Sequence, residues 1–132
     1  MNFNREFTNL LIIYFIGIIY WLILVFWREY NGKDILFLRK KIILNFNGWS
    51  ISHSIHYLVL AYVAPSYWLL LIFIGFVFEL IEGYMNKLSN FIDCKIVEDT
   101  ITNTIGVILG LILFKLFPNK INILNKITNI KF

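Results

Sequence analysis

The stretch TNLLIIYFIGIIYWLILVFW, from Thr8 to Trp27, contains no charged residue over 20 positions. As an α-helix this run is about 30 Å long, which matches the hydrocarbon core of a membrane. Trp21, Trp27 and Tyr30 place aromatic rings toward one end of the run, as interfacial anchors do. The stretch therefore predicts a transmembrane helix. We expect it to remain as an anchor, because the run is too long for a signal peptide and no small-residue cleavage site follows it.

The whole chain is too apolar for a water-soluble domain. Its 132 residues are 59% hydrophobic and 15% charged, and the mean hydropathy is +0.73. These values exclude a soluble globular protein, whose surface must be largely polar. The single cysteine, Cys94, excludes an intramolecular disulfide and a cysteine-based zinc site.

Three further apolar runs follow the first one. Pro65 and Ser66 separate the second run from the third and predict an antiparallel hairpin, and Pro118 stops the fourth. The sequence thus predicts an all-α, multi-pass integral membrane protein of about four transmembrane helices, forming one domain over 1–132. The expected spans are 8–27, 49–64, 67–85 and 99–117.

The polar segments between the spans carry most of the charge. Residues 28–48 mix charges with ILFL and IIL, which predicts an amphipathic segment lying in the membrane interface. The basic residues of this loop and of the tail, 118–132, are interpreted as topology determinants or contacts to anionic lipid, so we expect a lipid partner and no nucleic acid. The membrane face that would hold the 28–48 loop and the 87–98 connector carries seven Lys and Arg, and the opposite face carries five. This difference weakly favours a cytoplasmic location for the face with seven.

Four antiparallel spans would bring the unusual polar residues to one membrane face. His53 and His56 open the second span, and Glu79 and Glu82 close the third; each pair is spaced i, i+3 and shares a helix face. The connector 87–98 and the fourth span would add Asn90, Asp93, Asp99 and Asn103. A carboxylate at membrane depth needs a partner, so the sequence predicts that Glu79 contacts a histidine or a cation.

The fourth span carries a stripe of four residues at i, i+4, i+7 and i+11: Asp99, Asn103, Gly106 and Gly110. The two glycines form a GxxxG motif, which predicts close helix packing below the polar end. Simpler interpretations stay open for some of these residues. Glu82 could snorkel to the interface, and Asp99 could cap its helix.

The predicted site favours chemistry at a phosphate. Oxygen ligands from Glu79, Glu82, Asp93 and Asp99 suit a hard cation such as Ca²⁺, and a neutral histidine beside it can take a proton from a hydroxyl. We therefore predict catalytic roles for His53, Glu79 and Glu82. The predicted ligands of substrate or cation are Asn90, Asp93, Asp99, Asn103 and His56.

Part of this pattern resembles the base-exchange phosphatidylserine synthases. The similar residues are Glu79-Leu-Ile-Glu82 and Asn90-Phe91-Ile92-Asp93-Cys94, with His53 ahead of Ser66-Tyr67. The resemblance covers about residues 50–112. It implies a calcium-dependent exchange of phospholipid head groups in which His53 is the base.

The fourth span is instead similar to VanZ-like membrane proteins, through Asp99-x-x-x-Asn103-x-x-Gly106-x-x-x-Gly110. This second resemblance implies a non-catalytic protein that binds an amphiphile or a partner helix. A proton or cation pathway is a third hypothesis, which the apolar second halves of the spans disfavour. The sequence alone leaves open whether the chain is an enzyme.

Overall fold

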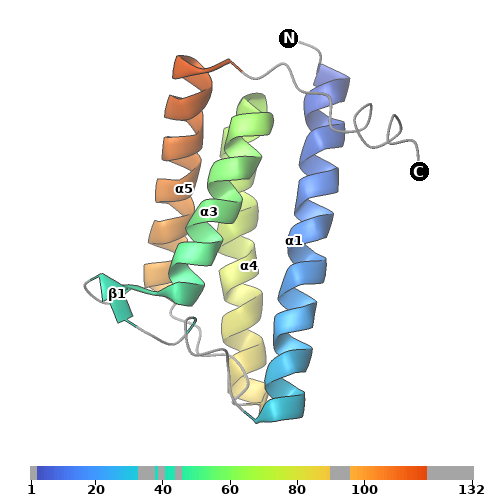
Figure 1. Cartoon of the computed structure of the whole chain (residues 1–132), viewed down its shortest axis with the longest axis vertical. Coiled ribbons are helices and arrows are strands. Elements are labelled where there is room, and N and C mark those ends of the chain that lie inside the picture. Colours follow the sequence, from blue (N-terminus) through green and yellow to red (C-terminus); the bar gives the residue numbers. More distant parts are fainter. Residues whose placement is uncertain (1–2, 33–37, 39–40, 44–45, 90–95, 119–132) are drawn as a thin grey trace.

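The computed structural model describes residues 3–32, 38, 41–43, 46–89 and 96–118. The long helices in this part of the chain are α1 (Phe3–Asn31), α3 (Gly48–Val63), α4 (Trp68–Ser89) and α5 (Ile96–Leu116), as Figure 1 shows. A short 3-10 turn, η1 (Pro65–Tyr67), joins α3 to α4. Two short antiparallel strands, β1 (Lys41–Ile43) and β2 (Phe46–Asn47), precede α3. Apart from these strands, the predicted all-α class is confirmed for the described residues.

Three of the helices are long and apolar enough to cross a membrane. The candidate spans are Arg5–Arg28, Pro65–Tyr84 and Ile96–Leu116. Large apolar side chains cover their outer surfaces: Phe15, Phe26 and Leu69 are 65%, 69% and 64% exposed. Lipid is the solvent in which such a surface is stable. The structure therefore supports the prediction of a membrane-embedded protein.

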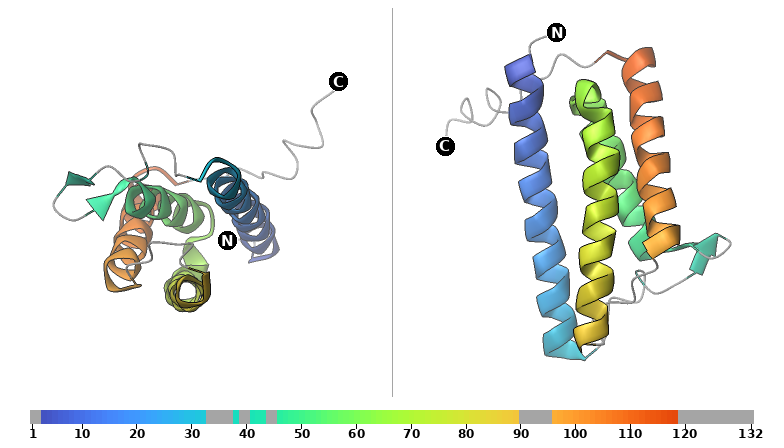
Figure 2. Two further views of the ribbon diagram at one scale, coloured as in Figure 1. Left: turned by 90° about the horizontal axis from the view of Figure 1, so that it is seen from below. Right: turned by 180° about the vertical axis from the view of Figure 1, so that it is seen from behind.

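Successive helices run in opposite directions. The end of α1, the start of α3, the end of α4 and the start of α5 all point toward the same end of the molecule (Figure 1). In the view from below, α3 lies between α1 and α5 (Figure 2). Segments that are distant in sequence are brought together in this way.

The closest contact between helices joins α3 and α5. A Cβ at Gly106 would overlap the backbone carbonyl of Ser54, and a Cβ at Gly110 would overlap that of Leu58. Only a hydrogen atom at these two positions lets the backbones approach so closely. The same face of α5 buries Asp99 and Asn103, so the close contact aligns a polar end with α3.

A polar contact attaches α1 to the turn between α3 and α4. The carboxylate of Glu6, which is only 4% exposed, accepts a hydrogen bond of 3.1 Å from the backbone N–H of Ser66 in η1. This N–H opens a helical segment and has no carbonyl partner within it. Next to this contact, an apolar core joins the helices; it contains Leu10, Tyr57, Leu60, Ala61, Ala64, Leu71 and Val107.

Two helices extend beyond their expected ends. The first continues to Asn31 instead of Trp27, and α4 continues to Ser89, about one turn past residue 85. As a result, Glu79 lies near the middle of its helix rather than toward its end. The candidate membrane span Pro65–Tyr84 nevertheless keeps Glu79 within the last two turns of the span, as the sequence predicts.

The described part of the predicted interfacial segment contains the end of α1, the helical residue Leu38 and the two short strands. β1 includes the β-branched Ile42 and Ile43, which favour extended backbone. The segment then ends at Asn47, whose side chain accepts a hydrogen bond of 3.0 Å from the N–H of Ser50 and thereby caps α3. The rest of the loop, the connector at 90–95 and the tail at 119–132 lie outside the described residues.

Candidate functional site

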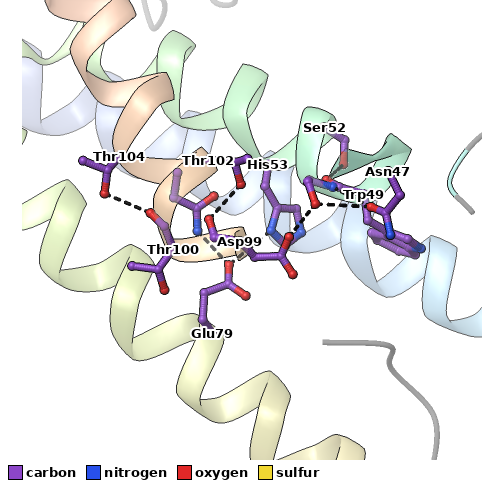
Figure 3. A network of polar contacts seen from close by, with 11 residues as sticks. Asn47, Trp49, Ser52, His53, Glu79, Asp99, Thr100, Thr102 and Thr104 are labelled. Atoms are coloured by element: carbon purple, nitrogen blue, oxygen red, sulfur yellow. Dashed lines mark hydrogen bonds and ion pairs between the residues drawn. The ribbon is translucent and has the colours of Figure 1, made fainter. Parts of the chain in front are cut away.

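Glu79 connects three helices through one carboxylate oxygen. Its side chain is 0% exposed. Its Oε1 accepts a hydrogen bond of 2.7 Å from Nδ2 of Asn103 on α5, and lies 3.2 Å from Nδ1 of His53 on α3. Figure 3 shows this carboxylate reaching from α4 into the space shared by the helices. These two contacts supply the partners that a carboxylate inside a membrane requires.

The spacing along α4 explains why Glu79 points inward. Leu71, Gly75, Glu79 and Glu82 are buried, whereas the neighbouring Leu80 and Ile81 are exposed. Intervals of four, four and three residues keep one helix face toward α3 and α5. The same face thus carries an apolar half and an acidic half.

Glu82 adds a second buried carboxylate to the site. It is 3% exposed, and each of His53, Glu79 and Glu82 offers one ligand atom within 4.8 Å of the others. Glu82 Oε1 is buried and has no hydrogen-bond partner among the described residues. A buried oxygen without a partner is costly, so this atom marks a place where a ligand can add a favourable contact.

A separate polar chain links Asp99 to the start of α3. Oγ of Ser50 donates a hydrogen bond of 2.6 Å to Oδ1 of Asp99, and Ser50 is held in turn by Asn47 at the α3 cap. Asp99 is 6% exposed and lies in the first turn of α5, where its charge complements the helix dipole. The Asp99 carboxylate therefore contacts Ser50, and Glu79 contacts the ring of His53 as the sequence predicts.

His56 occupies a different environment from His53. It lies against Gly17 of α1, where a Cβ would overlap its imidazole ring. The rings of Tyr14 and Tyr57 flank it, with centroids 6.4 Å and 5.8 Å from its own. The predicted pair therefore divides: His53 contacts the acids, and His56 contacts α1.

Both histidines line a cavity of about 70 Å³ between α1 and α3. Tyr20, which is half exposed, also lines it, so the cavity reaches the outer surface of α1. Most of the other lining residues are aromatic; they include Tyr14, Trp21, Trp49, Tyr57 and Phe78. We refer to this space as the aromatic cavity.

Several site residues were missed by sequence reasoning. Ser50 gave no signal, because a serine near a helix start is a common polar residue. Gly17 did give one, since a single glycine inside the apolar run 8–27 marks a close approach by a neighbour. Trp21, which the sequence predicts to be an interfacial anchor, also lines the aromatic cavity.

Two predicted ligands cannot be placed. Asn90 and Asp93 lie outside the described residues. Among the residues that are described, Asn103 lies in the network through Nδ2, and its Oδ1 is buried without a hydrogen-bond partner. Gly106 and Gly110 lie below the network, at the contact with α3.

The donor set fits a divalent cation. Two carboxylates, one imidazole and the open oxygens of Glu82 and Asn103 come together in a buried region. Carboxylate and amide oxygens suit Ca²⁺ or Mg²⁺, whereas the imidazole of His53 also suits transition metals and zinc. The arrangement can also move a proton, because His53 and Glu79 share a hydrogen bond.

No protein-family model matches the chain, and no curated protein or solved structure matches it either.

Proposed function

We propose that this chain is a four-span membrane enzyme that transfers phospholipid head groups at the His53, Glu79 and Glu82 site. The observation that carries the proposal is the buried cluster itself: two acids and a histidine whose ligand atoms lie within 4.8 Å of one another. One carboxylate oxygen, Glu82 Oε1, has no hydrogen-bond partner in the described part of the chain. Buried ionisable groups in a membrane are costly, and they mark functional sites.

The fourth span of the proposal is α3. Its 16 residues are about 24 Å long, somewhat less than the hydrocarbon thickness. It packs along α5 through the two glycines and continues through η1 into α4. A helix that packs mainly on one spanning helix, and also contacts the other two, need not be as apolar or as long as its neighbours.

The proposed reaction is an exchange at the lipid phosphate. An incoming alcohol forms a new bond from its oxygen to phosphorus, and the bond from phosphorus to the old head-group oxygen breaks. His53 takes the proton from the incoming hydroxyl and returns it to the departing oxygen, so the reaction needs no oxidant or further reactant. The hydrogen bond to Glu79 orients the imidazole and stabilises its protonated form.

Glu79 and Glu82 would hold a divalent cation in the same proposal, with calcium as the first candidate. When bound, such a cation neutralises the acids and stabilises charge on the phosphate. Asn103 would orient Glu79 through its amide. Asp99 would hold the start of α5 against Ser50, which keeps Asn103 in position.

The test is calcium-dependent incorporation of labelled serine into phospholipid. The purified chain in liposomes of phosphatidylcholine and phosphatidylethanolamine is compared with Glu79→Gln and His53→Gln. Leu80→Ala, on the exposed side of the same helix turn, serves as the matched control. We expect incorporation by the parent chain and by Leu80→Ala, and its loss in both site variants. Full activity in folded Glu79→Gln would refute the proposal.

The aromatic cavity favours a second candidate, a non-catalytic protein that binds an amphiphile. Its walls are largely aromatic rings, which suit a ligand with both polar and apolar parts. This candidate predicts that His53→Gln is tolerated while substitutions at Gly106 and Gly110 are harmful. Retained lipid binding without serine incorporation would favour it over the enzyme.

A further inference from the structure

The aromatic cavity has the composition of a site for an organic cation. Six of the side chains that line it carry neutral aromatic rings: Tyr14, Tyr20, Trp21, Trp49, Tyr57 and Phe78. No lysine or arginine is among the described residues that line it. The faces of such rings attract ammonium groups, and the attraction grows when water is excluded.

The rings form a connected wall rather than isolated contacts. Trp21 on α1 meets Phe78 on α4 with centroids 5.7 Å apart, and Phe78 lies 6.2 Å from the ring of His53. Trp49 packs on the other side of His53 at 6.3 Å. Residues from three helices therefore surround one space, so the site depends on the tertiary structure.

A buried carboxyl group, that of Glu82, lies close to this wall. A carboxylate oxygen of Glu82 lies within 4.8 Å of a ring nitrogen of His53, and His53 lines the cavity. Because Glu82 Oε1 is buried and has no hydrogen-bond partner among the described residues, the carboxylate can act as a counter-charge. Aromatic faces backed by a carboxylate favour a cation over an anion or a neutral group.

We propose that the aromatic cavity binds the ammonium group of a zwitterionic lipid head group. The volume of about 70 Å³ suits a small group of this kind and not an acyl chain. An inorganic ion would bind the carboxylates and would not need the rings. The inference deepens the proposed function. The assignment of the ammonium group to a lipid rests on that proposed function, whereas the recognition of an ammonium group rests on the aromatic rings and Glu82.

Binding is measured by calorimetry on the full chain in detergent, with a chelator present and no serine. The probes are choline and its neutral isostere 3,3-dimethylbutanol, followed by dihexanoyl-phosphatidylcholine and dihexanoyl-phosphatidylglycerol. We expect each ammonium compound to bind about tenfold more tightly than the probe of the same pair that has no ammonium group. Equal affinities within both pairs would overturn the proposal.

The chain provides matched tryptophan variants for this experiment. Trp21→Leu and Trp49→Leu remove rings that line the cavity, whereas Trp27→Leu and Trp68→Leu remove exposed rings outside it. We expect choline affinity to fall about tenfold in either cavity variant and in Glu82→Gln, and to be unchanged in the two controls. Using two cavity variants covers the case in which one of them fails to fold. Unchanged affinity in a folded cavity variant would overturn the proposal.

The two lipid probes identify the source of the ammonium group. Tighter binding of dihexanoyl-phosphatidylcholine than of choline supports a lipid head group, and the reverse order overturns that source. The experiment contains no transfer reaction. Ammonium binding without serine incorporation would therefore support the ammonium site and refute the proposed transfer reaction. Serine incorporation without a preference for ammonium compounds would support the transfer reaction and refute the ammonium site.

Discussion

Glu79 Oε1 lies 3.2 Å from His53 Nδ1, across the space between α4 and α3. The two residues are separated by 26 positions in the sequence, and Glu79 lies within the candidate span Pro65–Tyr84. The same oxygen accepts the amide of Asn103, so one atom holds three helices together. This arrangement makes the network both a structural element and the candidate site.

Removing the carboxylate of Glu79 should therefore destabilise the fold. In Glu79→Leu, the imidazole of His53 and the amide of Asn103 lose their shared acceptor inside the protein. We expect the free energy of unfolding to fall by about 3 kcal/mol, measured by thermal or denaturant unfolding in detergent. Leu80→Ala, an exposed position on the same turn, should change it by far less. Equal effects of the two substitutions would contradict the role given to Glu79.

The contact between α3 and α5 should not accept a side chain. Gly106→Ala places a methyl group against the Ser54 carbonyl, so the helices must separate. We expect a loss of about 1–3 kcal/mol in unfolding free energy, and none of similar size for Ile105→Ala, which changes an exposed neighbour. A Gly106→Ala variant as stable as the parent would show that the two backbones are further apart.

The contact between α1 and α3 can be tested through Gly17 and His56. Gly17→Ala should push α1 away from the His56 ring and lower the unfolding free energy by about 1–3 kcal/mol. His56→Ala removes the ring, so the double variant should recover much of this loss. A double-mutant cycle measures the coupling, and purely additive effects would mean that the two residues do not meet.

A divalent cation should stabilise the chain through the acids. At a calcium concentration of 100 times the dissociation constant, the expected gain in unfolding free energy is about 2.7 kcal/mol, and a chelator should reverse it. Thermal unfolding in a series of calcium, magnesium and manganese identifies the preferred ion. Glu82→Gln should reduce the gain strongly. An equal gain in that variant would place the cation elsewhere.

If α3 crosses the membrane with the other three helices, both termini lie on the same side. Epitope tags at each end of the chain should then be protected from protease together, or cleaved together, in sealed vesicles of one orientation. A chain with only three crossings would expose one tag and protect the other. The assay thus counts the spans by parity and leaves the buried site unchanged.

The sequence by itself determined the class of protein. The uncharged run 8–27 and the later apolar runs predict helices in lipid, because a helix of that length satisfies its backbone hydrogen bonds within the segment. It also determined the buried stripe of α5, since Asp99, Asn103, Gly106 and Gly110 recur at helical spacing and all four are buried. Both results depend on local periodicity and hydropathy, which are properties of the chain before it folds.

The tertiary structure decided which polar residues meet. His53 and His56 share a helix face by spacing, yet only His53 contacts Glu79, while His56 lies against Gly17. Likewise, the hydrogen bond of Asp99 to Ser50 joins two residues that are 49 positions apart in the sequence. These choices depend on how far each helix is rotated and shifted against its neighbours. Close packing at the glycines fixes those quantities, and no single helix encodes them.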